Sequence, residues 1–271
     1  MRYSIVVSNR GTRNDNNPFG FNKNFEFDQI LGIKDFLSKV TISPFGLIKE
    51  LLLICPGGYP KYSIGEPSEM IQFNDQIINI KPVIDYLHNL NINPIVWNGV
   101  IATRYLDKPE YPVMFSDDWI KLQHKAVERL INAGVYHIGF DYFNHFFMHN
   151  HRKAFNFIKR YHEDVMFYLE SVIRVNKCTP EQLKYRDKCY AIGTPYQTVA
   201  SINLTDSNRP TFRSIETFIK DNNLFNFRLH LHSAGVKWYK TEIDYFMENF
   251  TDKIIIQEKL LDQVLQGYAV K

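Results

Sequence analysis

The sequence predicts an α/β protein that folds as one (β/α)8 TIM-type barrel, with residues 1–271 in a single domain. Short and nearly continuous apolar runs alternate with amphipathic stretches of helix length, and such runs are typical of parallel strands that are covered on both faces. Eight runs occur at about 30 residues per strand–helix unit, which matches the size of this fold. No internal repeat, low-complexity tract or linker divides the chain.

The elements follow from this alternation. The expected strands are 3–9, 51–58, 94–99, 137–143, 165–170, 190–195, 228–232 and 253–258. The expected helices include 79–89, 117–133, 152–161, 180–188, 214–221 and 241–249. Ser116 is a suitable N-cap for the second of these helices, and Gly134 a suitable residue just after its end. An open doubly wound sheet is disfavoured, because the chain lacks both GxGxxG after the first run and GxxxxGK[ST].

Composition limits the class of protein. Aromatic residues make up 15% of the chain, which excludes intrinsic disorder. Three widely spaced cysteines exclude a disulfide scaffold and a zinc or iron–sulfur motif, and they favour a reducing, cytoplasmic location. We expect no membrane segment and no cofactor. Abundant Asn, Ile and Lys are typical of an AT-rich genome, such as that of a phage, a virus or a low-GC bacterium. For a viral protein the expected location is the cytoplasm of the host.

In a barrel of this kind, catalytic residues lie at the C-terminal ends of the strands. Asp141 ends an apolar run between aromatic residues, so we expect a partly desolvated general acid or base, with a helix-capping Asp as the alternative. Glu170 and Glu258 end two other runs, and a pair of carboxylates across a barrel mouth is suited to cleaving a glycosidic bond. Their alternative is a stabilising role in the first turn of a helix.

The other candidates for the site are substrate-binding residues at the same ends of the strands. They are Asn98, Gly99, Tyr142, Gly193, Thr194, Gln197, His230 and His232. His230 and His232 alternate with leucines and so share one strand face. Hydrogen bonding to substrate or to neighbouring strands is favoured over metal binding for this pair, because no further ligand spacing supports a metal. His145, His149 and His151 are expected in a polar loop.

Basic residues on the two helices that flank the fifth strand form a solvated face or, alternatively, a phosphate-contacting patch. The net charge of +3 predicts no strong nonspecific binding to nucleic acid, but it is compatible with a local basic groove.

Two motifs resemble a known family. The segment 190–194, YAIGT, followed after a helix by 229–235, LHLHSAG, resembles the YAIGG and HLxGxG pair of the tRNA-guanine transglycosylases. The resemblance implies a (β/α)8 barrel and exchange of guanine for a 7-deazaguanine base in tRNA, or in DNA for some relatives. It also implies that Asp141 reads the guanine edge. Nucleic acid and a purine or 7-deazaguanine base are then the expected partners.

The chain departs from that family at catalytic positions. The family's nucleophilic Asp ends the last strand, where Glu258 stands here, and Asn98 is the nearest polar residue to the position of its DSGG strand. The Gln of its VQGG strand is replaced by Leu169 or Glu170, and the CxCxxC zinc motif is absent. The activity is therefore either altered or lost.

Three functions remain open on the sequence. The first is base exchange at the N-glycosidic bond of a purine nucleotide in DNA or tRNA, and the second is glycoside hydrolysis on the same barrel. The third is a non-catalytic virion or assembly subunit.

Overall fold

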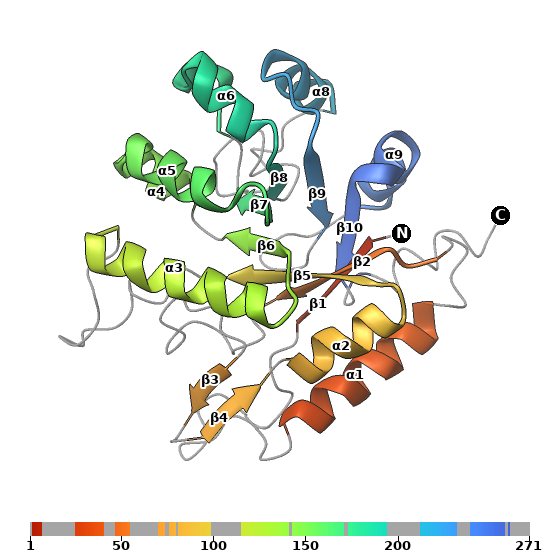
Figure 1. Cartoon of the computed structure of the whole chain (residues 1–271). Helices are drawn as coiled ribbons and strands as arrows, with labels where there is room; N and C mark the ends of the chain where they lie inside the picture. The colour runs from red at the N-terminus through yellow and green to blue at the C-terminus, as the bar shows by residue number, and fades with distance from the viewer. Residues whose placement is uncertain are drawn as a thin grey trace, which may run out of the picture. The chain divides into compact units, whose positions relative to one another are not determined.

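Eight parallel strands form a closed barrel in the computed structural model of the chain. Their order is β1-β10-β9-β8-β7-β6-β5-β2, and the described pairings between them are parallel. Helices separate consecutive barrel strands along the chain (Figure 1). The predicted (β/α)8 barrel is confirmed by this strand order.

The structure describes residues 2–6, 25–40, 47–54, 70–73, 76–79, 81–98, 115–140, 143–170, 173–193, 212–231, 239–257 and 260. The strands are β1 Arg2–Val6, β2 Glu50–Ile54, β3 Met70–Phe73, β4 Gln76–Asn79, β5 Asn93–Asn98, β6 His137–Phe140, β7 Met166–Glu170, β8 Tyr190–Gly193, β9 Phe227–Leu231 and β10 Ile254–Gln257. The helices are α1 Phe25–Val40, α2 Lys81–Asn89, α3 Asp117–Asn132, α4 Phe143–His149, α5 His151–Tyr161, α6 Pro180–Arg186, α8 Phe212–Asp221 and α9 Lys240–Phe250, with short 3-10 turns η2 Val175–Lys177 and η4 Thr251–Lys253. Within these ranges, no helix has the length and apolar character needed to cross a bilayer.

The chain packs as two compact units. One comprises Met1–Ser4 and Phe143–Lys271, and the other Ile5–Tyr142. The second unit contains β2, β5 and β6, with α1, α2 and α3, and also a separate antiparallel pair, β3 and β4. The first contains β7 to β10, most of β1, and the helices from α4 onward.

The predicted ends of α3 are confirmed. The Ser116 hydroxyl accepts a hydrogen bond from the Trp119 backbone N–H at 3.2 Å, and Asp117 and Asp118 occupy the first turn. Gly134 adopts a φ of 87°, the left-handed conformation that commonly ends a helix. Trp119, Val127 and Leu130 form its buried side.

Two expectations differ from the structure. The expected strands include no residue between 59 and 93, but Met70–Phe73 pairs with Gln76–Asn79 as a hairpin. The histidines expected in a polar loop are helical, because His145 and His149 lie in α4 and His151 begins α5. A strong aromatic pattern explains the second difference, since Phe143, Phe146 and Phe147 bury one side of α4.

A close approach fixes the packing of β5 against β6. Trp97 is in register with Gly139, and a Cβ at Gly139 would lie 2.2 Å from Cε3 of the Trp97 ring. Only glycine leaves room for the indole at this position, because real Cβ contacts are never that short.

Gly139→Ala should therefore lower the free energy of unfolding by about 1–3 kcal/mol, the usual cost of overpacking. Urea denaturation of the purified protein measures the change. The matched test is the same substitution in a Trp97→Val background, where the clash is absent and the added cost should be smaller. An equal cost in both backgrounds would contradict the steric explanation.

Candidate active site at the carboxyl ends of the strands

The strands of the first unit have an apolar face that packs against helices. Phe167 of β7 contacts Phe157 and Tyr161 of α5, with ring centroids 6.1 and 6.5 Å apart. Phe227 of β9 contacts Phe250 of α9 at 6.2 Å. Because side chains alternate along a strand, the residues between these must point the other way, into the barrel.

This inward face is unusually polar. Tyr168 of β7 is in register with Tyr190 of β8. Glu170 is in register with Ile192 of β8, which is in turn in register with Arg228 of β9. His230 is in register with Ile255 of β10, and Gln257 of β10 with Ser4 of β1. Arg228, His230 and Gln257 are 3%, 8% and 5% exposed, so these polar groups are buried within the protein. Buried polar side chains are retained where they are hydrogen-bonded or serve a site.

Aromatic stacking holds Arg228 in place. The Tyr168 and Tyr190 rings stack at 4.9 Å with 12° between their planes, and the Arg228 guanidinium lies 4.1 Å from the Tyr190 ring centroid. Its Nη1 also donates to the Phe227 carbonyl at 3.2 Å. A guanidinium is suited to this position because it is planar, weakly hydrated and able to stack on a ring.

Glu170 lies at the C-terminal end of the inward face. It is the last residue of β7 and is partly exposed, whereas Tyr168, two residues earlier on the same face, is fully buried. His230 is the penultimate residue of β9 and Gln257 the last of β10. The carboxylate, the imidazole and the amide therefore share one face and one end of the sheet, with β8 between Glu170 and His230.

The structure places only some of the predicted site residues. Asn98 and Gly193 are the last residues of β5 and β8, as expected for residues at the strand ends. The remaining predicted residues lie outside the described part of the chain; these are Gly99, Asp141, Tyr142, Thr194, Gln197, His232 and Glu258. Their roles stay predictions.

Sequence reasoning missed Arg228 as part of the inward face. The signal was present in RLHLH, because the alternation that gives His230 and His232 one face also includes Arg228. Among the described residues, no group of three His, Cys, Asp or Glu side chains is arranged to hold a metal ion.

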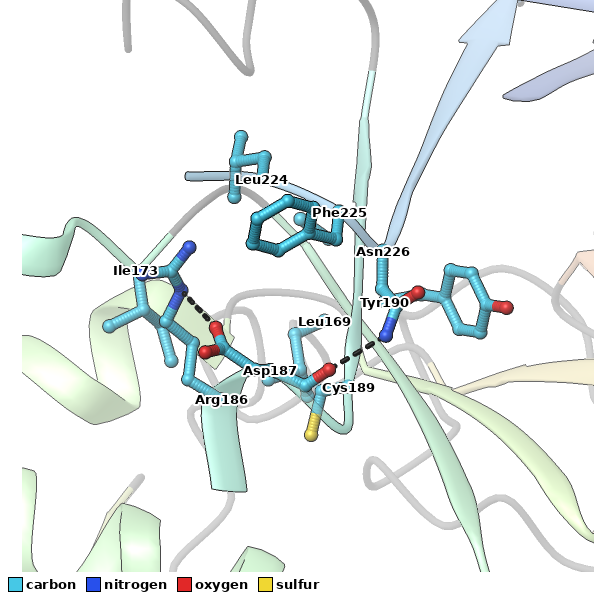
Figure 2. A pocket seen from close by; sticks show the side chains of 10 residues that line it. Leu169, Ile173, Arg186, Asp187, Cys189, Tyr190, Leu224, Phe225 and Asn226 are labelled. Atoms are coloured by element: carbon cyan, nitrogen blue, oxygen red, sulfur yellow. Dashed lines mark hydrogen bonds and ion pairs between the residues drawn. The ribbon is translucent and has the colours of Figure 1, made fainter. Parts of the chain in front are cut away.

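A small cavity lies on the other side of the sheet. Its volume is about 20 Å³, room for about one water molecule. It is lined by Leu169, Ile173, Arg186, Asp187, Cys189, Tyr190, Ala191, Leu224, Phe225 and Asn226 (Figure 2). Leu169 and Ala191 place the cavity on the helix-facing side, although Tyr190 of the inward face also borders it. It is far too small for a purine.

Hydrogen bonds around the cavity join α6 to α8. The buried Arg186 donates from Nη2 to the Asn222 carbonyl at 2.5 Å and to the Asn223 carbonyl at 3.3 Å, just after the end of α8. Its Nε lies 3.6 Å from Asp187, and the Asn226 amide donates to the Asp187 carbonyl at 2.7 Å, as the dashed lines of Figure 2 show. The Arg186 contacts beside the cavity thus form a structural clamp between α6 and the residues that follow α8.

No family model and no curated protein matches the chain. Among solved structures, it is similar to an α-amylase from Lactobacillus plantarum, at 12% identity and a TM-score of 0.48, over 95% of this chain and 69% of that one. This similarity is too low to indicate an activity, and the assignment of the fold is based on the strand order of the barrel.

Arg186→Met should destabilise the protein by about 2–3 kcal/mol, because hydrogen bonds from a charged group to buried carbonyls are lost. Chemical denaturation checks this. Lys184→Met, on the exposed side of the same helix, is the matched control and should change stability by less than about 0.5 kcal/mol. Equal effects of the two substitutions would exclude the clamp.

The two described cysteines should differ in reactivity. Burial raises the pKa of the Cys189 thiol to about 12, with the nearby Asp187 carboxylate adding to the effect. Burial also raises the pKa of Cys178, which is only half-buried and lies near the Arg186 cation that partly opposes the shift. Since only the thiolate is alkylated, iodoacetamide near neutral pH should modify Cys178 slowly and leave Cys189 intact until the protein unfolds. Peptide mapping by mass spectrometry measures both, and rapid labelling of native Cys189 would show the burial to be wrong.

Proposed function

We propose that the protein transfers a glycosyl group by base exchange at the N-glycosidic bond of a purine nucleotide in DNA or tRNA. One observation supports this most: residues 190–193 and 229–231, the described parts of the two segments that resemble the transglycosylase motifs, belong to adjacent parallel strands, β8 and β9. Glu170 ends the neighbouring strand β7, and His230 points to the same side of the sheet.

Base exchange needs a nucleophile at C1′ and a group that protonates or holds the departing base. Glu258 and Asp141 are the sequence candidates for the nucleophile and for the reader of the base edge. Glu170 would supply the proton, because its carboxyl group is partly exposed where substrate enters while its strand neighbours are buried. His230, an imidazole with limited exposure, would hydrogen-bond the sugar or the base.

The same carboxylate also suits hydrolysis of an O-glycosidic bond, which uses a carboxylic acid in an equivalent role. Glycoside hydrolysis is therefore the competing function, and aryl glycosides must be assayed in parallel with nucleic acid.

Glu170→Gln should reduce release of labelled guanine from DNA or tRNA by at least about 100-fold, because a positioned general acid contributes about 10²–10⁴ to a rate. The amide keeps the size of the side chain but has no acidic proton. Glu248→Gln, on the exposed surface of α9, is the matched control and should retain wild-type activity.

The outcomes separate the three functions. Guanine release by the wild type, lost in Glu170→Gln, supports base exchange with Glu170 as catalyst, and full activity in Glu170→Gln removes that role from Glu170. Hydrolysis of aryl glycosides without guanine release favours the hydrolase. Absence of both activities leaves the non-catalytic subunit.

A further inference from the structure

Helices α4 and α5 carry positive charge without any acidic residue. Between residues 143 and 161 there are four Lys or Arg residues and three His, but no Asp or Glu. On four other helices a lysine forms an ion pair with an acidic residue of the same helix, in the pairs Lys39–Asp35, Lys81–Asp85, Lys121–Asp118 and Lys240–Asp244. The surface of α4 and α5 is therefore locally basic although the chain as a whole is close to neutral.

The charges on α5 occupy an unfavourable place for helix stability. The N-terminus of a helix carries a partial positive charge and favours acidic residues. The first turn of α5 has none, and Arg152 and Lys153 stand there instead. Positions that oppose local stability are where a functional requirement is expected.

The cations of α5 are accessible to different extents. Arg152 and Arg160 are exposed and Lys153 is half-buried. Lys153, Asn156 and Arg160 follow an i, i+3, i+7 spacing, so they align along one side of α5. We call this surface, with the exposed His145 and His149 of α4, the basic face. Lys159, whose Nζ lies 3.5 Å from Glu181, is not counted in the basic face, and the Arg160 guanidinium in the face lies 5.4 Å from the Tyr161 ring centroid.

The start of the basic face lies at the same end of the barrel as Glu170, whereas Arg160 lies at the other end of α5. A short turn joins α5 to β7, with the Val165 N–H donating to the Tyr161 carbonyl at 2.8 Å, so the helix and the strand run antiparallel. The 11 residues of α5 and the 5 of β7 span similar lengths, about 16 and 17 Å. The start of α5, with Arg152 and Lys153, is therefore level with the C-terminal end of β7.

We propose that the basic face binds the phosphate backbone of the nucleic acid substrate and leads it toward Glu170. The identity of the polyanion rests on the proposed function, whereas the charge and placement of the face do not. A nucleic acid fits better than an anionic bilayer, because the apolar residues of α5 are all buried and Met148 is the one large apolar side chain exposed on α4, too little apolar surface to insert into lipid. Arginine and lysine side chains beside histidines are suited to contacting phosphates.

The test compares two triple substitutions of equal charge. Arg152→Ala/Lys153→Ala/Arg160→Ala removes the three Arg and Lys side chains of the basic face, and Arg213→Ala/Lys220→Ala/Lys240→Ala removes three exposed cations from α8 and α9. Binding of fluorescein-labelled duplex DNA and of a tRNA transcript is measured by anisotropy over a range of NaCl concentrations. Circular dichroism melting confirms that both variants fold.

The basic-face variant should bind at least about tenfold more weakly. The slope of log affinity against log salt should also fall by about 2–3, since each lost phosphate contact on duplex DNA contributes about 0.9. The control should stay within about twofold of wild type, because distant exposed charges are screened. The charge reversal Arg152→Glu should weaken binding more than Arg152→Ala does.

Equal losses in the two triple variants, or no loss in the first, would overturn the proposal. The proposal would also be overturned if the basic-face variant lost binding to phosphatidylserine vesicles while its binding to nucleic acid stayed unchanged. A wild type that binds nucleic acid through the basic face but exchanges no base contradicts the proposed function alone. Undiminished base exchange and binding in the basic-face variant contradict this inference alone.

Discussion

Every strand of the barrel has to bury both of its faces, and the arrangement of the whole protein depends on this constraint. On β9 all five residues are buried, although they alternate between apolar side chains and the polar pair Arg228 and His230. The apolar set meets the helices, which leaves the polar set no place except the barrel interior. A polar interior is costly to form, and stacking of Arg228 on Tyr190 is one way in which that cost is offset.

The inward face changes character along the strands. On β7 the buried Tyr168 is followed two residues later by the partly exposed Glu170. The stacked rings of Tyr168 and Tyr190 therefore lie nearer the N-terminal ends of their strands than the Glu170 carboxylate does. The packed end supplies rigidity, and the open end is where water, substrate and an ionisable group meet. A barrel of this type separates stability from chemistry along its strands in the same way.

The alternation of apolar runs and amphipathic stretches was sufficient to predict the barrel and most helices to within about two residues at each end. Helix α3 is the clearest case, because Ser116 and Gly134 carry local chemistry that ends a helix regardless of its surroundings. The hairpin of β3 and β4 was missed, since its strands are short and separate from the barrel.

The candidate site was less predictable, for physical reasons. Glu170 and His230 could be assigned to the ends of apolar runs, and the structure places them there. Arg228 was overlooked because a cation in an apolar run is expected to face solvent, and only the register and the stacking on Tyr190 show that it faces inward. His145 and His149 appeared to belong to a loop, because the polar residues concealed the aromatic side of α4.

The Arg186 contacts couple parts of the chain that are distant in sequence. Its guanidinium, at the end of α6, holds carbonyl groups that follow α8, 36 and 37 positions away. Neither helix end can fray without uncovering a buried cation, so amide hydrogens in both should exchange with solvent through the same opening event. Two successive strand–helix repeats thereby behave as one cooperative block during partial unfolding.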